Sequence, residues 1–136
     1  MTAQLNIRNE QLELTENSRI SWSIEFKSIQ LIGEYTTEGG PFVDDYFFVF
    51  VNSNGTLYEV SNDLINYPTF WTKLSSLLNS HLQPKLASST LFNSRILYPE
   101  HLTGEPLFNL VASGTGQLEL SEQANGQLKN GDESTY

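Results

Sequence analysis

The longest uninterrupted apolar run of the chain, Tyr46 to Val51, restricts the fold more than any other segment does. Its aromatic and β-branched residues favour a β-strand, and the lack of alternation indicates a strand covered on both faces. The pair Asn54-Gly55 follows and favours a type I′ turn, in which both central residues have positive φ. The sequence therefore predicts an antiparallel hairpin whose second strand begins soon after Gly55.

The position of this turn sets the pairing of the two strands. With a two-residue loop at 54–55, Val51 lies opposite Tyr58 and Val49 lies opposite Val60. By default, the second face of the apolar strand is covered by a later part of the chain. The alternatives are a second copy of the protein, which would make a homodimer, and a bound apolar ligand.

The segment 20–27 alternates apolar and polar residues, which is the period of a strand with one exposed face. The apolar phase then shifts by one residue at Lys27-Ser28. This shift favours a bulge or a tight bend over a break into two strands. A further strand is predicted over 91–98, where Leu91 and Phe92 begin another apolar stretch.

One amphipathic helix is predicted over 68–83. Pro68 suits a first helical turn, and Pro84 disfavours helical geometry in the residue before it. Between the two prolines, apolar residues recur every three or four positions and form one stripe. The stripe consists of Phe70, Trp71, Leu74, Leu77, Leu78 and Leu82.

Together, these segments predict an α+β domain in which an antiparallel sheet of four to six strands is packed by one main helix. The alternative is a pleckstrin-homology-like half-open barrel, which also places its strands first and a helix later. Aromatic residues concentrate between Trp22 and Phe108, which predicts a single domain over 1–112 with loosely held N-terminal residues. Residues 113–136 are rich in Gly, Gln, Asn and acids, and they predict a flexible acidic tail.

The composition limits the classes of function. The chain has 136 residues with 7 Lys and Arg against 16 Asp and Glu, a net charge of -9 that disfavours nucleic acids and anionic membranes as partners. The absence of cysteine excludes a thiolate nucleophile and a cysteine-ligated metal site. No secretory signal and no membrane span are recognised, so a cytoplasmic protein is expected, with neither a metal nor a cofactor.

Sequence motifs typical of catalysis, such as a Walker loop or Gly-x-Ser-x-Gly, are missing from the chain. His81 lies near the end of the predicted helix, where a partly protonated imidazole suits the helix dipole. His101 is the other histidine and lies between Glu100 and Glu105 in a Pro- and Gly-containing loop. A carboxylate that orients this imidazole would make a weak hydrolase-type site at Glu100 and His101, although a surface loop explains the same residues.

The leading functional hypothesis is a non-catalytic binding or adaptor protein that recognises a basic protein partner through an acidic surface. Four acids flank the predicted turn at 39–41 and are the candidate partner-binding residues: Glu34, Glu38, Asp44 and Asp45. The alternative is a module that binds a small molecule or lipid on the aromatic sheet face. Its candidate ligand-binding residues are Phe48, Phe50 and Trp71.

Overall fold

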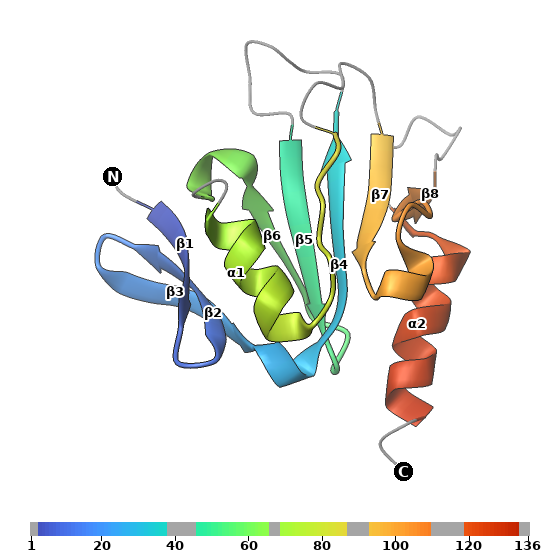
Figure 1. Cartoon of the computed structure of the whole chain (residues 1–136), viewed down its shortest axis with the longest axis horizontal. Helices are drawn as coiled ribbons and strands as arrows, with labels where there is room; N and C mark the ends of the chain where they lie inside the picture. Colours follow the sequence, from blue (N-terminus) through green and yellow to red (C-terminus); the bar gives the residue numbers. More distant parts are fainter. Residues whose placement is uncertain (1–2, 38–45, 66–68, 87–92, 110–118, 134–136) are drawn as a thin grey trace.

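A computed structural model describes residues 3–37, 46–65, 69–86, 93–109 and 119–133 (Figure 1). It confirms a broad α+β architecture built mostly from antiparallel strands. The first sheet has the order β1-β2-β3, formed by β1 (Ala3–Arg8), β2 (Gln11–Glu16) and β3 (Arg19–Glu25). The second has the order β6-β5-β4-β7, formed by β4 (Ile29–Thr36), β5 (Tyr46–Asn52), β6 (Leu57–Ser61) and β7 (Asn93–Tyr98).

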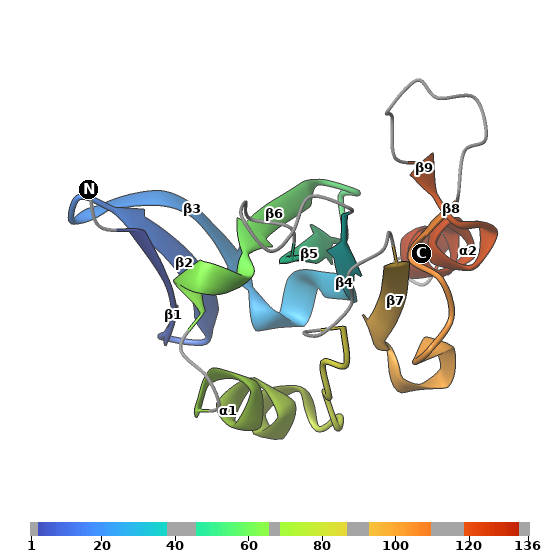
Figure 2. The ribbon, with the colours of Figure 1, turned by 90° about the horizontal axis from the view of Figure 1, so that it is seen from above.

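Two α-helices accompany the sheets: α1 (Thr69–Leu78) and α2 (Glu122–Glu133). A two-stranded ladder joins β8 (Phe108–Asn109) to β9 (Glu119–Leu120). Three short 3-10 turns complete the described elements: η1 (Phe26–Ser28), η2 (Asn62–Leu64) and η3 (Glu100–Leu102). Seen from above, α1 and α2 lie on opposite sides of the second sheet (Figure 2). Within the described ranges, neither helix is long and apolar enough to cross a membrane.

The number of strands exceeds the prediction because the first residues of the chain form β1 and β2 instead of packing loosely. Asn9 and Glu10 connect these strands with φ angles of 51° and 64°, as a type I′ turn requires. The turn contains no glycine, so its sequence gives a weak signal. The described strands form separate open sheets and no closed barrel, unlike the half-open barrel considered as an alternative.

The hairpin of β5 and β6 is confirmed, but its predicted register is wrong by one residue. Asn52 donates its amide to the carbonyl of Thr56 at 3.1 Å, so the loop between them has three residues. Gly55 has a φ of 82°, the left-handed conformation that such a loop needs. Val51 consequently faces Leu57, and Phe50 faces Tyr58.

The helix α1 ends at Leu78, five residues before the predicted end at residue 83. Asn79 has a φ of 52°, and Ser80 donates its amide to the carbonyl of Ser75 at 3.0 Å. This is the Schellman arrangement, which terminates a helix through a left-handed residue. The asparagine, and not Pro84, therefore ends the helix, and Leu82 is buried on an extended segment instead.

At Lys27-Ser28 the chain forms two strands, which was the less favoured alternative, with a tight turn between them and no bulge. Residues Phe26–Ser28 form η1, and the strands on either side of it belong to different sheets. The change of sheet lets the apolar residues change phase while Ile24, Phe26, Ile29 and Leu31, on either side of the shift, all stay buried. The predicted strand over 91–98 is observed as β7, which begins at Asn93 in the described part of the chain.

The predicted flexible tail contains β9 and α2. Ser121 caps the helix, since its Oγ accepts the amide of Ala124 at 3.1 Å and donates to the carbonyl of Pro106 at 2.6 Å. Ala124 is fully buried, and Leu120 and Leu128 pack against the same cluster. The spacing of these three residues places them on one side of the segment, a pattern that the low apolar content concealed.

The second sheet separates two apolar clusters. Phe48 and Phe50 face α1 and the first sheet, whereas Val49 and Val51 face the cluster that contains Ala124. The prediction that β5 is covered on both faces is thus confirmed. A later part of the chain supplies the second cover, as expected by default.

Candidate functional site

The candidate acidic residues fall into two groups. Glu38, Asp44 and Asp45 lie outside the described residues. Glu34 lies on β4 and is fully buried, with 0% exposure. A buried carboxylate cannot meet a partner protein, so Glu34 is not part of a docking surface.

The carboxylate of Glu34 is instead bound by several groups of the chain itself. It accepts a hydrogen bond from the hydroxyl of Tyr46 at 2.6 Å. The amide of Lys85 donates to both oxygens, at 3.1 and 3.0 Å, and the amide of Leu86 donates at 3.1 Å. Arg95 forms an ion pair with it at 3.4 Å. Glu34 thereby fastens the extended segment after α1 to the sheet.

The three residues of the ligand-binding alternative are core residues. Phe48 and Phe50 are fully buried, and Trp71 is 4% exposed. The rings of Phe48 and Trp71 lie with their centroids 4.7 Å apart, in direct contact. The helix and the sheet therefore pack against each other where the hypothesis places an apolar ligand.

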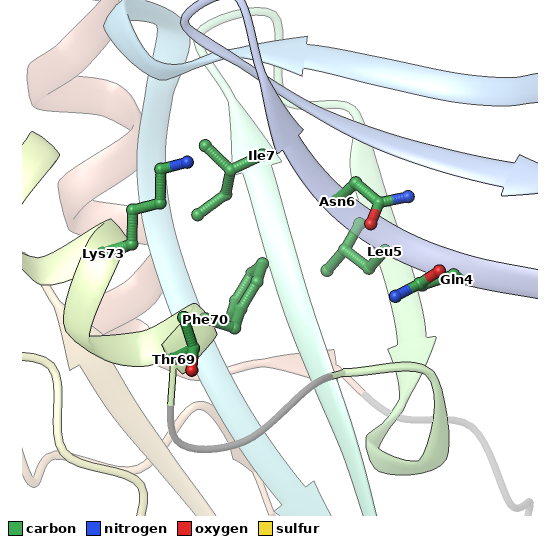
Figure 3. Close-up of a pocket in the computed structure, with 7 residues that line it drawn as sticks. All are labelled: Gln4, Leu5, Asn6, Ile7, Thr69, Phe70 and Lys73. Atoms are coloured by element: carbon green, nitrogen blue, oxygen red, sulfur yellow. The ribbon is translucent and has the colours of Figure 1, made fainter.

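A shallow pocket of about 130 Å³ lies elsewhere, between β1 and α1 (Figure 3). Leu5, Ile7 and Phe70 provide its apolar surface, with Lys73 and Thr69 on the helix side. Ligand sites usually have volumes of roughly 300 to 1,000 Å³. This pocket is thus large enough for a single side chain or a group of a few atoms.

In the part of the chain that the structure describes, neither histidine lies in a catalytic arrangement with other side chains. His101 is exposed in η3, and no hydrogen bond joins it there to Glu100 or Glu105, which are also exposed. The carboxylate of Glu105 accepts the side-chain amide of Gln123 at 3.5 Å instead. His81 is exposed beyond the end of α1. Among the described residues, no group of three His, Cys, Asp or Glu side chains could hold a metal ion.

One charge feature was missed in the sequence although it requires no structure to see. Residues 28–72 contain six acids and no Lys, Arg or His. This cation-free span runs from the end of η1 through β4, β5 and β6 to the first turn of α1. Its acids are Glu34, Glu38, Asp44, Asp45, Glu59 and Asp63.

Glu59 is the exposed carboxylate of this span on β6, the strand at the edge of the second sheet. The hydroxyl of Tyr35 donates to its carboxylate at 2.8 Å. Burial raises the pKa of Tyr35, and the hydrogen bond and the negative charge of Glu59 raise it further. The arrangement keeps the Tyr35 hydroxyl protonated, so that it remains a hydrogen-bond donor to Glu59.

No protein family model, curated protein or solved structure matches this chain.

Proposed function

We propose that this protein is a non-catalytic binding protein of the cytoplasm, and that it recognises a basic protein partner through an acidic surface on the cation-free span. The observation that carries the proposal is the distribution of charge over residues 28–72, six acids without a single basic side chain. The burial of Glu34 against Arg95 removes one of these acids from the surface. Glu59 and Asp63 remain as exposed acids on the described part of the span. The span also includes the three candidate acids between β4 and β5 in the sequence.

An uninterrupted acidic surface attracts a basic protein before contact is made. Charges of one sign raise the rate of diffusional encounter and disfavour partners of the same sign. Neighbouring cations would cancel this field over a Debye length of about 10 Å at 0.1 M salt. The absence of basic residues from the span favours such an attraction for Lys- and Arg-rich proteins, because no side chain within the span itself neutralises its acids.

The proposal is tested by capturing partners on the immobilised protein and measuring the association rate of each at increasing ionic strength. A captured partner is expected to have a positive net charge. Its association rate constant should fall by about tenfold or more between roughly 0.05 and 0.5 M salt, because surface charges are screened. An acidic partner, or a rate constant that does not respond to salt, would contradict the proposal.

A further inference from the structure

We infer that the partner docks on the outer edge of β6. An extended basic segment of the partner pairs with this edge and becomes a fifth strand of the second sheet. This inference rests on the proposed function and deepens it, since it names the surface and the mode of binding. Addition of a strand to a free sheet edge is a general mode of peptide recognition, in which main-chain hydrogen bonds supply affinity.

The register of the hairpin shows which groups of β6 point outward. Asn52 and Thr56 form a hydrogen-bonded pair at the loop, with the amide of Asn52 on the carbonyl of Thr56 at 3.1 Å. Hydrogen-bonded and non-hydrogen-bonded pairs alternate along an antiparallel ladder. Leu57, opposite Val51, is therefore in a non-hydrogen-bonded pair, and so is Glu59, two residues further on. The amides and carbonyls of Leu57 and Glu59 point away from β5.

This outer edge is accessible. β6 ends the strand order of its sheet, Leu57 is 41% exposed and Glu59 is also exposed. Within the described ranges, no main-chain hydrogen bond outside the ladder involves either residue. The strand contains no proline or lysine, and its pairing with β5 has no register shift. Proline, lysine and a bulge commonly protect a sheet edge from pairing, and β6 has none of these three.

At the opposite edge of the same sheet, other segments of the chain cover the edge strand β7. Ile96 on β7 donates its amide to the carbonyl of Glu105 at 2.7 Å and accepts the amide of Gly104 at 3.0 Å. Ser94, two residues away, accepts the amide of Phe108 at 3.0 Å through its Oγ. The chain thus pairs the outward amide and carbonyl of Ile96 and occupies the edge beside Ser94, whereas the outward amides and carbonyls of Leu57 and Glu59 on β6 have no such main-chain partner within the described ranges.

The side chains around β6 suit a basic strand. Glu59 offers a carboxylate, and residues 28–72 contain no cation to compete for it. The neighbouring Tyr58 is partly buried, and its ring lies 4.8 Å from that of Trp22, centroid to centroid. Aromatic faces attract Lys and Arg side chains. Successive side chains of an added strand point to opposite faces, so basic residues at alternate positions all lie on one face. In one orientation they lie beside Glu59, and in the other they lie beside the aromatic rings.

A second copy of the chain fits this edge less well. A two-fold pairing of β6 centred on Glu59 would place the two Glu59 carboxylates directly opposite each other, and like charges in that position are destabilising. Each copy also carries a net charge of -9. Charge therefore favours a basic partner strand over self-association.

The test uses a synthetic peptide of about eight residues that alternates lysine and threonine, a length typical of strands. Its affinity is measured by titration calorimetry for the full chain, for Leu57→Pro and for the matched control Leu57→Thr. Proline at 57 removes an outward amide without touching the inner ladder, whereas threonine keeps the amide but also removes the exposed leucine. We expect Leu57→Pro to bind at least about tenfold more weakly than Leu57→Thr, which corresponds to about 1.4 kcal/mol.

Two further measurements test the inference even if the variant Leu57→Pro fails to fold. The same peptide with N-methyl groups on alternate amides keeps its charge but cannot pair along one edge, and it should bind the unaltered protein at least about tenfold more weakly. Hydrogen exchange of the Leu57 and Glu59 amides should slow when the peptide saturates the protein.

The outcomes separate the inference from the proposed function. Salt-sensitive binding that is equal for both variants, without slowed exchange, would overturn the strand addition but leave a basic partner in place. No peptide binding would also overturn it. A dimer of the unaltered protein that Leu57→Pro dissociates would show that a second copy uses the edge. The proposed function fails separately, if the partners captured on the protein are acidic.

Discussion

The two faces of the second sheet are both buried, but different interactions close them. The α1 face has large aromatic residues and a buried carboxylate, Glu34, that fastens an extended segment to β4. The α2 face is covered by a helix that contributes Ala124 and Leu128 to an apolar cluster with Leu107 and Phe108. One face thus depends on a polar anchor, and the other depends on close steric fit.

The largest effect is expected from Glu34→Gln on the α1 face. Glutamine has the shape of glutamate, but it offers only one acceptor oxygen to the donors from Tyr46, Lys85, Leu86 and Arg95. It also leaves Arg95 without its counter-ion. Breaking a buried ion pair costs about 3 kcal/mol or more. Urea unfolding measures the loss, with the exposed Glu16→Gln as control, and equal stability of the two variants would refute the role of the anchor.

The steric fit of the α2 face is probed by Gly33→Ala. A Cβ on Gly33 would lie 2.6 Å from a methyl carbon of Leu107, a fully buried side chain. Overpacking of this kind costs about 2 kcal/mol, and urea unfolding should show it. Gly126→Ala in α2 is the matched control, since nothing lies within 4 Å of the added carbon. If both substitutions leave stability unchanged or raise it, the face is more adaptable than its geometry indicates.

Ser121→Ala tests how α2 is held on the second sheet, with a smaller expected loss of stability than Gly33→Ala. The change removes the cap on the amide of Ala124 and the hydrogen bond to Pro106. Loss of such a cap costs about 1 kcal/mol. We expect amide exchange to accelerate in α2 before it does so in α1, and Ser76→Ala on the exposed side of α1 serves as control. A uniform change over both helices would show that the two covers unfold together.

The smallest effect at neutral pH is expected from Tyr35→Phe, which removes the hydrogen bond to Glu59 and costs about 1 kcal/mol. The pKa of Tyr35 is raised in the folded protein. As pH rises above about 10, the unfolded chain therefore loses this proton before the folded protein does, and stability falls. The unfolding free energy of the unaltered protein should thus decline more steeply above about pH 10 than that of Tyr35→Phe. Parallel declines would contradict the assignment.

Strong local patterns of the sequence were enough to predict the α1 face. The apolar run of β5 and the aromatic stripe of α1 identified a strand and a helix that do pack together. The register of the hairpin was missed because the side chain of Asn52 accepts the amides of Asn54 and Thr56, which holds a three-residue loop. An asparagine just before Asn-Gly carries this information only when its side-chain hydrogen bonds are considered.

The helix α2 and the strands β1 and β2 were missed for another reason. Their segments have few aromatics, so burial depends on contacts that arise only in the folded chain, such as the cap at Ser121 on Pro106. The burial of Glu34 was missed in the same way. Glu34 is acidic like its neighbours in sequence, and nothing local shows that Arg95, 61 residues away, makes it a buried anchor.

The central claim is that charge within residues 28–72, and not the overall charge, recognises a basic partner. It is tested by the association rate constant of a captured basic partner for two triple variants with the same change in net charge. One replaces Glu38, Asp44 and Asp45 by their amides, and the other replaces Glu100, Glu105 and Glu122. The account predicts a rate about tenfold slower for the first and little change for the second. Equal slowing of both would contradict it.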